Sequence, residues 1–238
     1  AVIEMKPEPS GLTRNVVQCL DDWGIPLYLS HTVTDINGKE RVEAITVAKV
    51  DEHYQPIKGT ETKFDCDALL LSVGLIPENE LSKQIGVKLS PVTKGPVVDN
   101  SMQTSVSGVF ACGNVAHVHD LVDNVTLEAQ TAGAGAAAYI NGTLKQTEKI
   151  PVLHGEGISY VLPGFIDPGF YEKNTAVCFR VTKTAERVSV LIQKDGETIQ
   201  KFHRDRITAG EMERIPICHE LLQKLAGSRE ITVSLEVR

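Results

Sequence analysis

The stretch TSVSGVFACGNVAHVHD, from Thr104 to Asp120, is the part of the sequence that predicts the fold most directly. Its apolar run Val109–Cys112 predicts a buried strand, and this strand ends on Gly113 and Asn114. A glycine at the end of a strand lets a ligand approach the main chain where a Cβ atom would collide. The short side chain of Asn114 can hydrogen-bond a sugar hydroxyl. A ligand contact is therefore one interpretation of this bend.

A helix rich in small residues is predicted from about Thr126. Free N–H groups near Val125 and Thr126, with the positive end of the helix dipole, would attract an electron-rich ring edge or a phosphate. The same residues are also typical of a plain strand–loop turn followed by a tightly packed helix. The sequence leaves both interpretations open.

The run GAGAAA, residues 133–138, is similar to a GxGxxA dinucleotide-binding motif. That motif requires a strand directly before its first glycine, whereas this run lies inside the predicted helix. We expect instead that its small residues let the helix pack closely on a neighbouring backbone.

His117 and His119, with Asp120 and Asp123 nearby, suggest a metal cluster. An HxH pattern on a strand would put both rings on one face, but the sequence offers no evident third ligand. We therefore expect no metal site and interpret this segment as a polar loop beside a cofactor.

The first residues follow a βαβ pattern, which is typical of a parallel sheet. Val2 and Ile3 predict a strand, Thr13–Trp23 a helix and Ile25–Leu29 a short buried strand. Glu4 closes the first strand, where an acid can bind the ribose of a dinucleotide; a surface glutamate is the alternative.

The next segment has an antiparallel pattern. Asn37-Gly38 predicts a hairpin between strands at Thr32–Ile36 and Val42–Val50, and a third strand near Thr60–Phe64 completes a meander. The apolar run Cys66–Gly74 then predicts a fully buried strand that ends on glycine.

Beyond about residue 148, apolar and polar residues alternate in short runs separated by turn signals. This pattern predicts an antiparallel sandwich. Its expected strands are Val177–Val181, Val188–Ile192, Thr198–Phe202 and Ile231–Val237.

Composition limits the classes of function. The 238 residues are 42% hydrophobic, which is typical of a globular protein, and no apolar run approaches the length of a membrane span. The net charge of -7 gives no footprint for nucleic acid or an anionic membrane. Five scattered cysteines without a CxxC pair predict neither a disulfide framework nor a zinc cluster, and favour a cytoplasmic location.

Two segments resemble a known family. DALLLSVGLIPENEL, Asp67–Leu81, resembles the returning strand of the two-dinucleotide flavoprotein disulfide reductases, and VVDNSMQTSVSGVFACGNV, Val97–Val115, resembles their second FAD motif. The spacing between the segments agrees as well. Over about residues 1–145 the chain resembles, within the FAD/NAD(P)-dependent pyridine nucleotide-disulfide oxidoreductases, the NAD(FAD)-dependent dehydrogenases associated with anaerobic glycerol-3-phosphate metabolism.

The resemblance implies an α/β fold, a partial two-dinucleotide-binding flavoprotein fold with an antiparallel meander, followed by the all-β, sandwich-like C-terminal domain. Residues 1–72 would be the latter half of an NAD(P)H-binding domain, 73–148 the returning part of an FAD-binding domain and 149–238 the C-terminal domain. FAD and NAD(H) are the implied cofactors, and flavin and nicotinamide nucleotide the implied binding partners.

The resemblance also implies roles for single residues. Gly113 and Asn114 would contact the ribityl–pyrophosphate region of the flavin, while Val125 and Thr126 would lie near the pyrimidine edge of its ring. Gly74 would line the nicotinamide side and Glu4 the adenosine ribose. Two departures from the family pattern are the amide of Asn114, where an aspartate is usual, and the triplet Ser72–Gly74. No catalytic residue is nominated.

The first residues lie in a predicted strand without an initiating methionine, so we expect a carboxy-terminal fragment of an FAD-dependent oxidoreductase. In the complete enzyme hydride would pass between NAD(P)H and flavin, and the isolated fragment would be inactive. The alternative is a cofactor-free assembly subunit of a dehydrogenase complex, which would bind its partner through the C-terminal domain.

Overall fold

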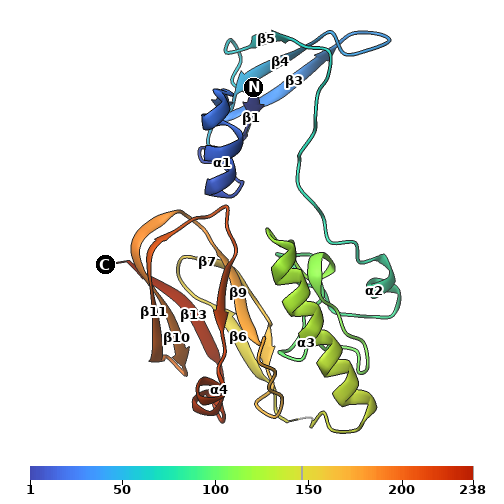
Figure 1. Cartoon of the computed structure of the whole chain (residues 1–238), viewed down its shortest axis with the longest axis vertical. Coiled ribbons are helices and arrows are strands. Elements are labelled where there is room, and N and C mark those ends of the chain that lie inside the picture. Colours follow the sequence, from blue (N-terminus) through green and yellow to red (C-terminus); the bar gives the residue numbers. More distant parts are fainter. Residues whose placement is uncertain (146, 238) are drawn as a thin grey trace. The chain divides into compact units, whose positions relative to one another are not determined.

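A computed structural model describes residues 1–145 and 147–237 (Figure 1). The chain forms two compact units, Ala1–Gly74 and Leu75–Arg238. The second unit includes both segments that the sequence assigns to an FAD-binding part and to a C-terminal domain. The division of labour at residues 72 and 148 therefore stays a prediction.

The first unit opens with the expected parallel strand pair. β1 (Val2–Ile3) pairs in parallel with β2 (Leu27–Tyr28), and α1 (Thr13–Cys19) lies between them in the chain. The helix is shorter than predicted, because the chain continues in a 3-10 turn, η1 (Asp21–Trp23), that ends on Gly24 with φ of +60°. All residues of α1 are at least partly exposed, so the apolar stripe of its sequence does not enter a core.

The meander is present with slightly shifted bounds. β3 (His31–Asn37), β4 (Ala44–Lys49) and β5 (Thr62–Asp65) form an antiparallel sheet in that order. Gly38 in the hairpin has φ of +127°, and a Cβ there would lie 1.9 Å from the Arg41 carbonyl oxygen, so only glycine fits. The central strand β4 supplies most of the buried side chains of this unit, and Val50, just after it, is also buried.

The predicted buried strand at Cys66–Gly74 is wrong. Leu70 and Val73 are 92% and 89% exposed, and no strand of the described chain pairs with this segment. An apolar run predicts burial only where other elements offer it a ladder and an apolar face. The described residues supply neither for this run.

The second unit begins with α2 (Glu80–Gln84) and a series of turns. The predicted strand Val109–Cys112 is reduced to one antiparallel bridge, Gln103↔Phe110, because its partner is a tight turn rather than a strand. The bend itself is a 3-10 turn, η2 (Gly113–Val115). The following helix, α3 (Val122–Ile140), begins earlier than predicted and packs on these turns through a small apolar cluster.

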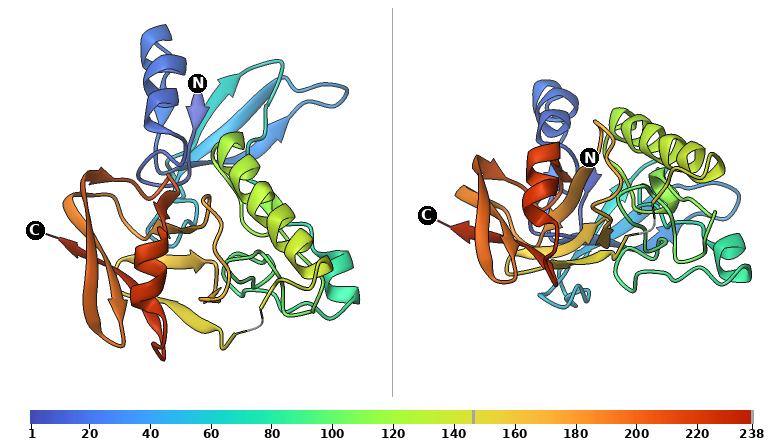
Figure 2. Two further views of the ribbon diagram at one scale, coloured as in Figure 1. Left: turned by 60° about the horizontal axis from the view of Figure 1, so that its bottom comes forward. Right: turned by 90° about the horizontal axis from the view of Figure 1, so that it is seen from below.

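The remaining residues form two sheets and one helix (Figures 1 and 2). The larger sheet has the order β11-β10-β13-β6-β8 and the smaller one β12-β9-β7. The expected all-antiparallel pattern is wrong at one pair, since β13 runs parallel to β6. The elements are β6 (Ile150–His154), β7 (Ile158–Leu162), β8 (Phe165–Ile166), β9 (Ala176–Val181), β10 (Ala185–Lys194), β11 (Glu197–Ile207), β12 (Glu213–Pro216), α4 (His219–Leu225) and β13 (Ile231–Val237).

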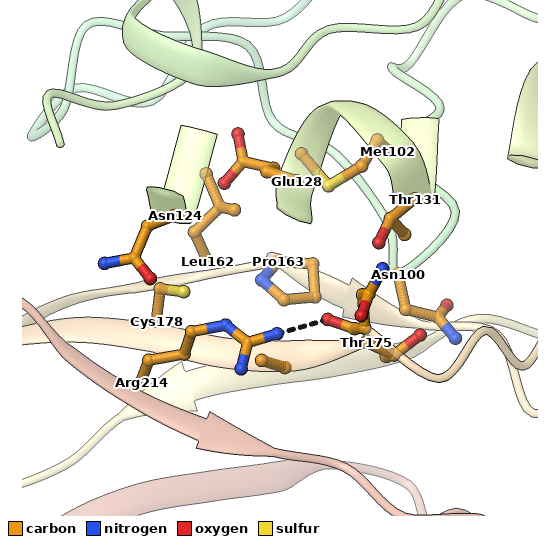
Figure 3. A pocket seen from close by; sticks show the side chains of 12 residues that line it. Asn100, Met102, Asn124, Glu128, Thr131, Leu162, Pro163, Thr175, Cys178 and Arg214 are labelled. Carbon is orange, nitrogen blue, oxygen red and sulfur yellow. Dashed lines mark hydrogen bonds between the residues drawn. The ribbon is translucent and has the colours of Figure 1, made fainter. Parts of the chain in front are cut away.

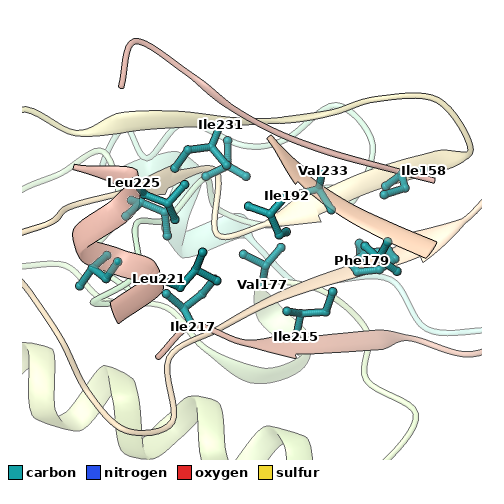
Figure 4. Close-up of a cluster of buried hydrophobic side chains, with 14 of the residues drawn as sticks. Ile158, Val177, Phe179, Ile192, Ile215, Ile217, Leu221, Leu225, Ile231 and Val233 are labelled. Carbon is teal, nitrogen blue, oxygen red and sulfur yellow. The ribbon is translucent and has the colours of Figure 1, made fainter. Parts of the chain in front are cut away.

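The two sheets share one apolar core, as the sandwich prediction requires (Figure 4). Phe179 and Ile215 come from the smaller sheet, Ile192 and Val233 from the larger one, and all four are fully buried. Leu225 closes the core from α4. Burying one such side chain contributes about 1.5–3 kcal/mol, so this core is the main source of stability in the unit.

Buried polar contacts join the core to the turns that precede α3. Asn100 donates from Nδ2 to the carbonyl oxygens of Asp167 and Phe170, at 3.1 and 2.9 Å, and its Oδ1 accepts from the Asp167 N–H at 2.6 Å. Asn100 is 2% exposed. These bonds cross the boundary predicted near residue 148, so the two sides of that boundary pack as one body.

Candidate functional site

The bend at Gly113 has the backbone conformation that a glycine permits, with φ of +70°. A Cβ atom at this position would lie 3.2 Å from Val125 Cγ1. The Gly113 N–H donates to Glu128 Oε1 at 2.6 Å. The bare main chain is therefore covered by two side chains of α3, Val125 and Glu128, in this structure.

Asn114, the next residue, is exposed, and it holds the loop that follows. Its Oδ1 accepts a hydrogen bond from the backbone N–H of His119 at 3.1 Å. The segment is fixed from the other side by Asn79, whose buried amide donates to the Val115 carbonyl oxygen at 2.9 Å. This last bond joins the two segments whose sequences resemble the flavoprotein family.

Behind the bend, the structure brings together three ionisable side chains. His117 Nε2 lies 3.0 Å from Glu128 Oε2, and His119 Nε2 lies 3.2 Å from the same oxygen. The side chains of His117, His119 and Glu128 are only 1%, 2% and 8% exposed. The two imidazole rings meet edge to face, with centroids 4.3 Å apart.

The charge of Glu128 is fixed by its two neighbours. Burial alone would raise the pKa of this carboxyl group, but hydrogen bonding and charge from His117 and His119 outweigh burial and lower the pKa to about 2. Glu128 is thus a carboxylate at neutral pH. A buried carboxylate beside two imidazoles can accept a proton from either ring or serve as a ligand of a cation.

The structure thus supplies a candidate third ligand, Glu128, that is not evident from the sequence. Glu128 lies outside the HxH pattern and belongs to α3, so the pattern does not predict that it is a neighbour of the histidines. Only the packing of α3 against the bend brings it close. Asp120, which the sequence groups with the histidines, is instead bound elsewhere, and Asp123 is not part of the cluster of three.

Asp120 ties the histidine loop to the smaller sheet. Its Oδ1 accepts from Arg180 Nη2 at 2.5 Å, and its Oδ2 accepts from the Met212 N–H at 2.6 Å. Burial would lower the pKa of Arg180, but its bonds and charge contact with Asp120 raise it. Arg180 also donates to the Val118 carbonyl oxygen at 3.2 Å. The strand β9 therefore positions the loop.

Two pockets adjoin this cluster. One has a volume of about 240 Å³ and is lined in part by His117, Tyr160 and Arg180. The other has a volume of about 30 Å³, room for about one water, and lies between Glu128 of α3 and Cys178 of β9 (Figure 3). Both are smaller than the roughly 300–1,000 Å³ that small-molecule sites occupy.

The predicted cofactor residues lie in different parts of the chain. Gly113, Asn114 and Val125 meet at the bend, whereas Gly74 and Glu4 belong to the first unit. Gly74 has φ of +93° and no atom within 4 Å of an added Cβ. Glu4 accepts from the N–H groups of Lys6 and Ser10 at 2.9 and 3.3 Å, so its carboxylate orders a local loop.

Val125 and Thr126 do not begin the helix as predicted. The free N–H groups of a helix belong to its first turn, which here starts at Val122. The Thr126 hydroxyl donates to the Val122 carbonyl oxygen at 3.2 Å. The residues at the bend fit a flavin in part: the Asn114 side chain is exposed, but the Gly113 N–H is already engaged by Glu128.

The chain has recognisable relatives. It is 29% identical over 147 residues to an NADH oxidase of Methanocaldococcus jannaschii, covering 59% of this chain and 29% of that protein. It is 28% identical over 178 residues to an NADH oxidase of Streptococcus pneumoniae, covering 72% and 36%. An NAD(P)H sulfur oxidoreductase (CoA-dependent) of Pyrococcus furiosus is 31% identical over 118 residues, covering 49% and 24%. The matched region thus spans between 24% and 36% of the length of these relatives.

A solved thioredoxin reductase from Gloeobacter violaceus covers 61% of this chain and 43% of its own, at 19% identity. The TM-score of this match is 0.27. Residues 2–136, more than half of the chain, match the pyridine nucleotide-disulphide oxidoreductase family, and this range includes both resembling segments, the bend and most of α3. The chain therefore belongs to the pyridine nucleotide-disulphide oxidoreductase family.

Proposed function

We propose that this chain is part of an FAD-dependent NAD(P)H oxidoreductase. The observation that supports this most directly is the family match over residues 2–136. FAD, when bound, would supply the hydride-accepting chemistry, while the protein would supply binding and orientation. The relatives named NADH oxidase and NAD(P)H sulfur oxidoreductase support the same class of reaction.

The bend would contribute to holding the flavin. The exposed amide of Asn114 is suited to hydrogen-bond the ribityl–pyrophosphate region, and the glycine conformation at Gly113 leaves the main chain without a Cβ. Val125 and Thr126 would lie near the pyrimidine edge of the ring. For the Gly113 N–H to donate to a flavin, it would have to exchange its bond with Glu128 for the new one.

The first unit would bind the nicotinamide nucleotide. Gly74 would line the nicotinamide side, where its open surroundings leave space for a ring. Glu4 would bind the adenosine ribose, and its negative charge opposes a 2′-phosphate, so we propose NADH as the preferred donor. The association with anaerobic glycerol-3-phosphate metabolism and the cytoplasmic location rest on the sequence alone and stay predictions. No helix in the described part of the chain has the length and hydropathy of a bilayer span.

The test is an absorbance spectrum of the full-length protein, followed by anaerobic titration with NADH and with NADPH. We expect an oxidised-flavin spectrum that NADH bleaches at lower concentration than NADPH. Glu4→Gln should reduce the preference for NADH, and Glu8→Gln, another acid of the same unit, serves as the control. A colourless protein that takes up no FAD on reconstitution would contradict the proposal.

A second candidate function has one observation in its favour. Glu128 already occupies the Gly113 N–H, and the adjoining pockets are small, as expected if the bend were only a packing feature. The chain would then be a cofactor-free assembly subunit that binds its partner through the strand edges of the C-terminal sheets. The flavin spectrum distinguishes the two functions, since the subunit would remain colourless with FAD.

A further inference from the structure

The cluster of His117, His119 and Glu128 has a composition suited to a metal ion. A ring nitrogen of each histidine and a carboxylate oxygen of Glu128 all lie within 4.8 Å of one another. Two imidazoles and one carboxylate form a mixed nitrogen and oxygen set, which Zn²⁺ and related divalent transition metals accept. Mg²⁺ and Ca²⁺ prefer sites built of oxygen.

The spacing of the donor atoms fits a single small ion. With Zn–N and Zn–O bonds of about 2.0–2.2 Å, two ligands of a tetrahedral site lie about 3.3 Å apart. The Glu128 Oε2 atom lies 3.0 Å from His117 Nε2 and 3.2 Å from His119 Nε2. Glu128 Oε2 is therefore already near the separation that a bound ion would impose between it and each of the two histidines.

His119 provides a second, independent observation. Its side chain is 2% exposed, Nε2 lies 3.2 Å from Glu128 Oε2, and Nδ1 has no hydrogen-bond partner among the described residues. Burying a ring nitrogen without a partner costs free energy, and the contact with Glu128 alone leaves Nδ1 without one. Nε2 faces the carboxylate at the distance of two ligands that share an ion, so it is placed to bind a metal.

The surrounding groups would orient the ligands. The Gly113 N–H holds the second oxygen of Glu128, at 2.6 Å, and leaves Oε2 directed at the histidines. His117 Nδ1 lies 3.4 Å from the Tyr160 hydroxyl, which can accept the proton that Nδ1 carries when Nε2 binds a metal. Asn114 fixes the backbone of His119. Such outer contacts are the usual supports of a metal site.

We propose that His117, His119 and Glu128 bind one divalent transition-metal ion, with Zn²⁺ as the ion of choice, through the two Nε2 atoms and Glu128 Oε2. Three protein ligands leave a fourth position for water or another small ligand, and His117 borders the pocket of about 240 Å³. A metal ion binds the unprotonated Nε2 atom of a histidine, so any proton on that atom passes to solvent on binding.

The test is a Zn²⁺ titration of the full chain in competition with a chromophoric chelator. The chain is first stripped of metal and alkylated at its exposed cysteines, Cys19 and Cys218, because free thiols also bind zinc. We expect one tight equivalent per chain. Co²⁺ in place of Zn²⁺ should give the intense visible bands of a four- or five-coordinate ion.

Variants distinguish this site from adventitious binding. Glu128→Gln retains an oxygen that can accept from the Gly113 N–H but removes the charge, and His119→Ala removes a ligand. Each should weaken Zn²⁺ binding by more than about tenfold, since even outer-shell changes cost 10–100-fold. The matched controls, Glu148→Gln and His154→Ala, change exposed residues and should bind as the parent chain does.

Thermal unfolding shows whether the variants fold and gives a second readout. Zn²⁺ should raise the unfolding midpoint of the parent chain and of both controls, and leave that of folded Glu128→Gln unchanged. Equal Zn²⁺ affinity in Glu128→Gln and the parent chain, or a Co²⁺ spectrum that stays that of the aqueous ion, would overturn the proposal. The measurements require no flavin, so their failure is distinct from failure of the proposed oxidoreductase function.

Discussion

At the scale of single residues, burial near α3 changes the pKa of the Cys178 thiol. Cys178 on β9 is buried beside the small pocket, and burial, with a smaller contribution from the charge of Glu128, raises the pKa of its thiol to about 12. Arg214 opposes this shift. Cys19 and Cys218, by contrast, are exposed. The cysteines of this chain should therefore differ widely in reactivity, because the thiolate is the nucleophile.

We predict that iodoacetamide at pH 8 alkylates Cys19 and Cys218 rapidly and Cys178 only after unfolding. The two exposed cysteines are internal controls, and peptide mass spectrometry with and without denaturant measures the difference. Because the folded pKa of Cys178 is raised above its unfolded value of 9.0, its contribution to stability is complete below pH 9 and is lost between about pH 9 and 12. Equal labelling of Cys178 and Cys19 in the native protein would contradict the burial of this thiol.

At the scale of elements, α3 shows why the small residues of its sequence matter. Gly135 faces the preceding turns, and a Cβ there would lie 2.3 Å from the Ser101 carbonyl oxygen. Gly133 has no atom within 4 Å of an added Cβ. The interpretation of GAGAAA as a close-packing helix segment, rather than a dinucleotide-binding motif, is thus confirmed for Gly135.

These two glycines form a matched pair for mutagenesis. Gly133→Ala should stabilise the protein by up to about 1 kcal/mol, because alanine is the better helix former. Gly135→Ala gains the same propensity but must displace a backbone oxygen, and such overpacking costs about 1–3 kcal/mol, so it should be destabilising. Urea unfolding of both variants measures the difference. If Gly135→Ala is as stable as Gly133→Ala, the close approach of α3 to Ser101 is wrong.

The sequence predicts elements well where the pattern is local. The hairpin at Asn37-Gly38 and the alternating strands of the C-terminal sheets are close to their predicted positions, because turn chemistry and side-chain alternation are properties of a few neighbouring residues. The sequence does not predict the start of α3 at Val122 or the parallel pairing of β13 with β6. Both depend on contacts with residues that are distant in the sequence.

The candidate site follows the same rule. The histidines and the glycine bend are visible in the sequence, whereas Glu128 and Arg180 become part of the site only through packing. No spacing rule connects a helix residue or a strand residue of a later sheet with His119. The sequence therefore predicts which loop forms the candidate site, but not which side chains of α3 and of the later sheet contact that loop.

At the scale of the whole molecule, the segment around the boundary of the two units exposes several large apolar side chains. Leu70, Val73 and Ile76 are 92%, 89% and 84% exposed. Residues 67–78 have no backbone–backbone hydrogen bond outside helices and strands, and belong to neither. Exposed apolar side chains on an unpaired backbone are preferred targets of proteases.

We predict that thermolysin, which cleaves before apolar residues, first cuts the native chain between Asp67 and Ile76. The product should be a resistant piece that begins near Leu75 and contains the core of Figure 4. Mass spectrometry of a short digestion locates the cut. Initial cleavage inside the sheets, at β9 or β10 for example, would show that this segment is protected and the sheets are not.

The three hydrogen bonds of Asn100 have a consequence for protein engineering. A swap that replaces everything after residue 148 with the carboxy-terminal region of a relative keeps these bonds only if the new backbone places two carbonyl oxygens and one N–H at the same positions around Asn100; otherwise the buried amide is left unpaired. Chimaeras of this protein should therefore be joined at the exposed stretch near Gly74, where the backbone makes no such hydrogen bonds.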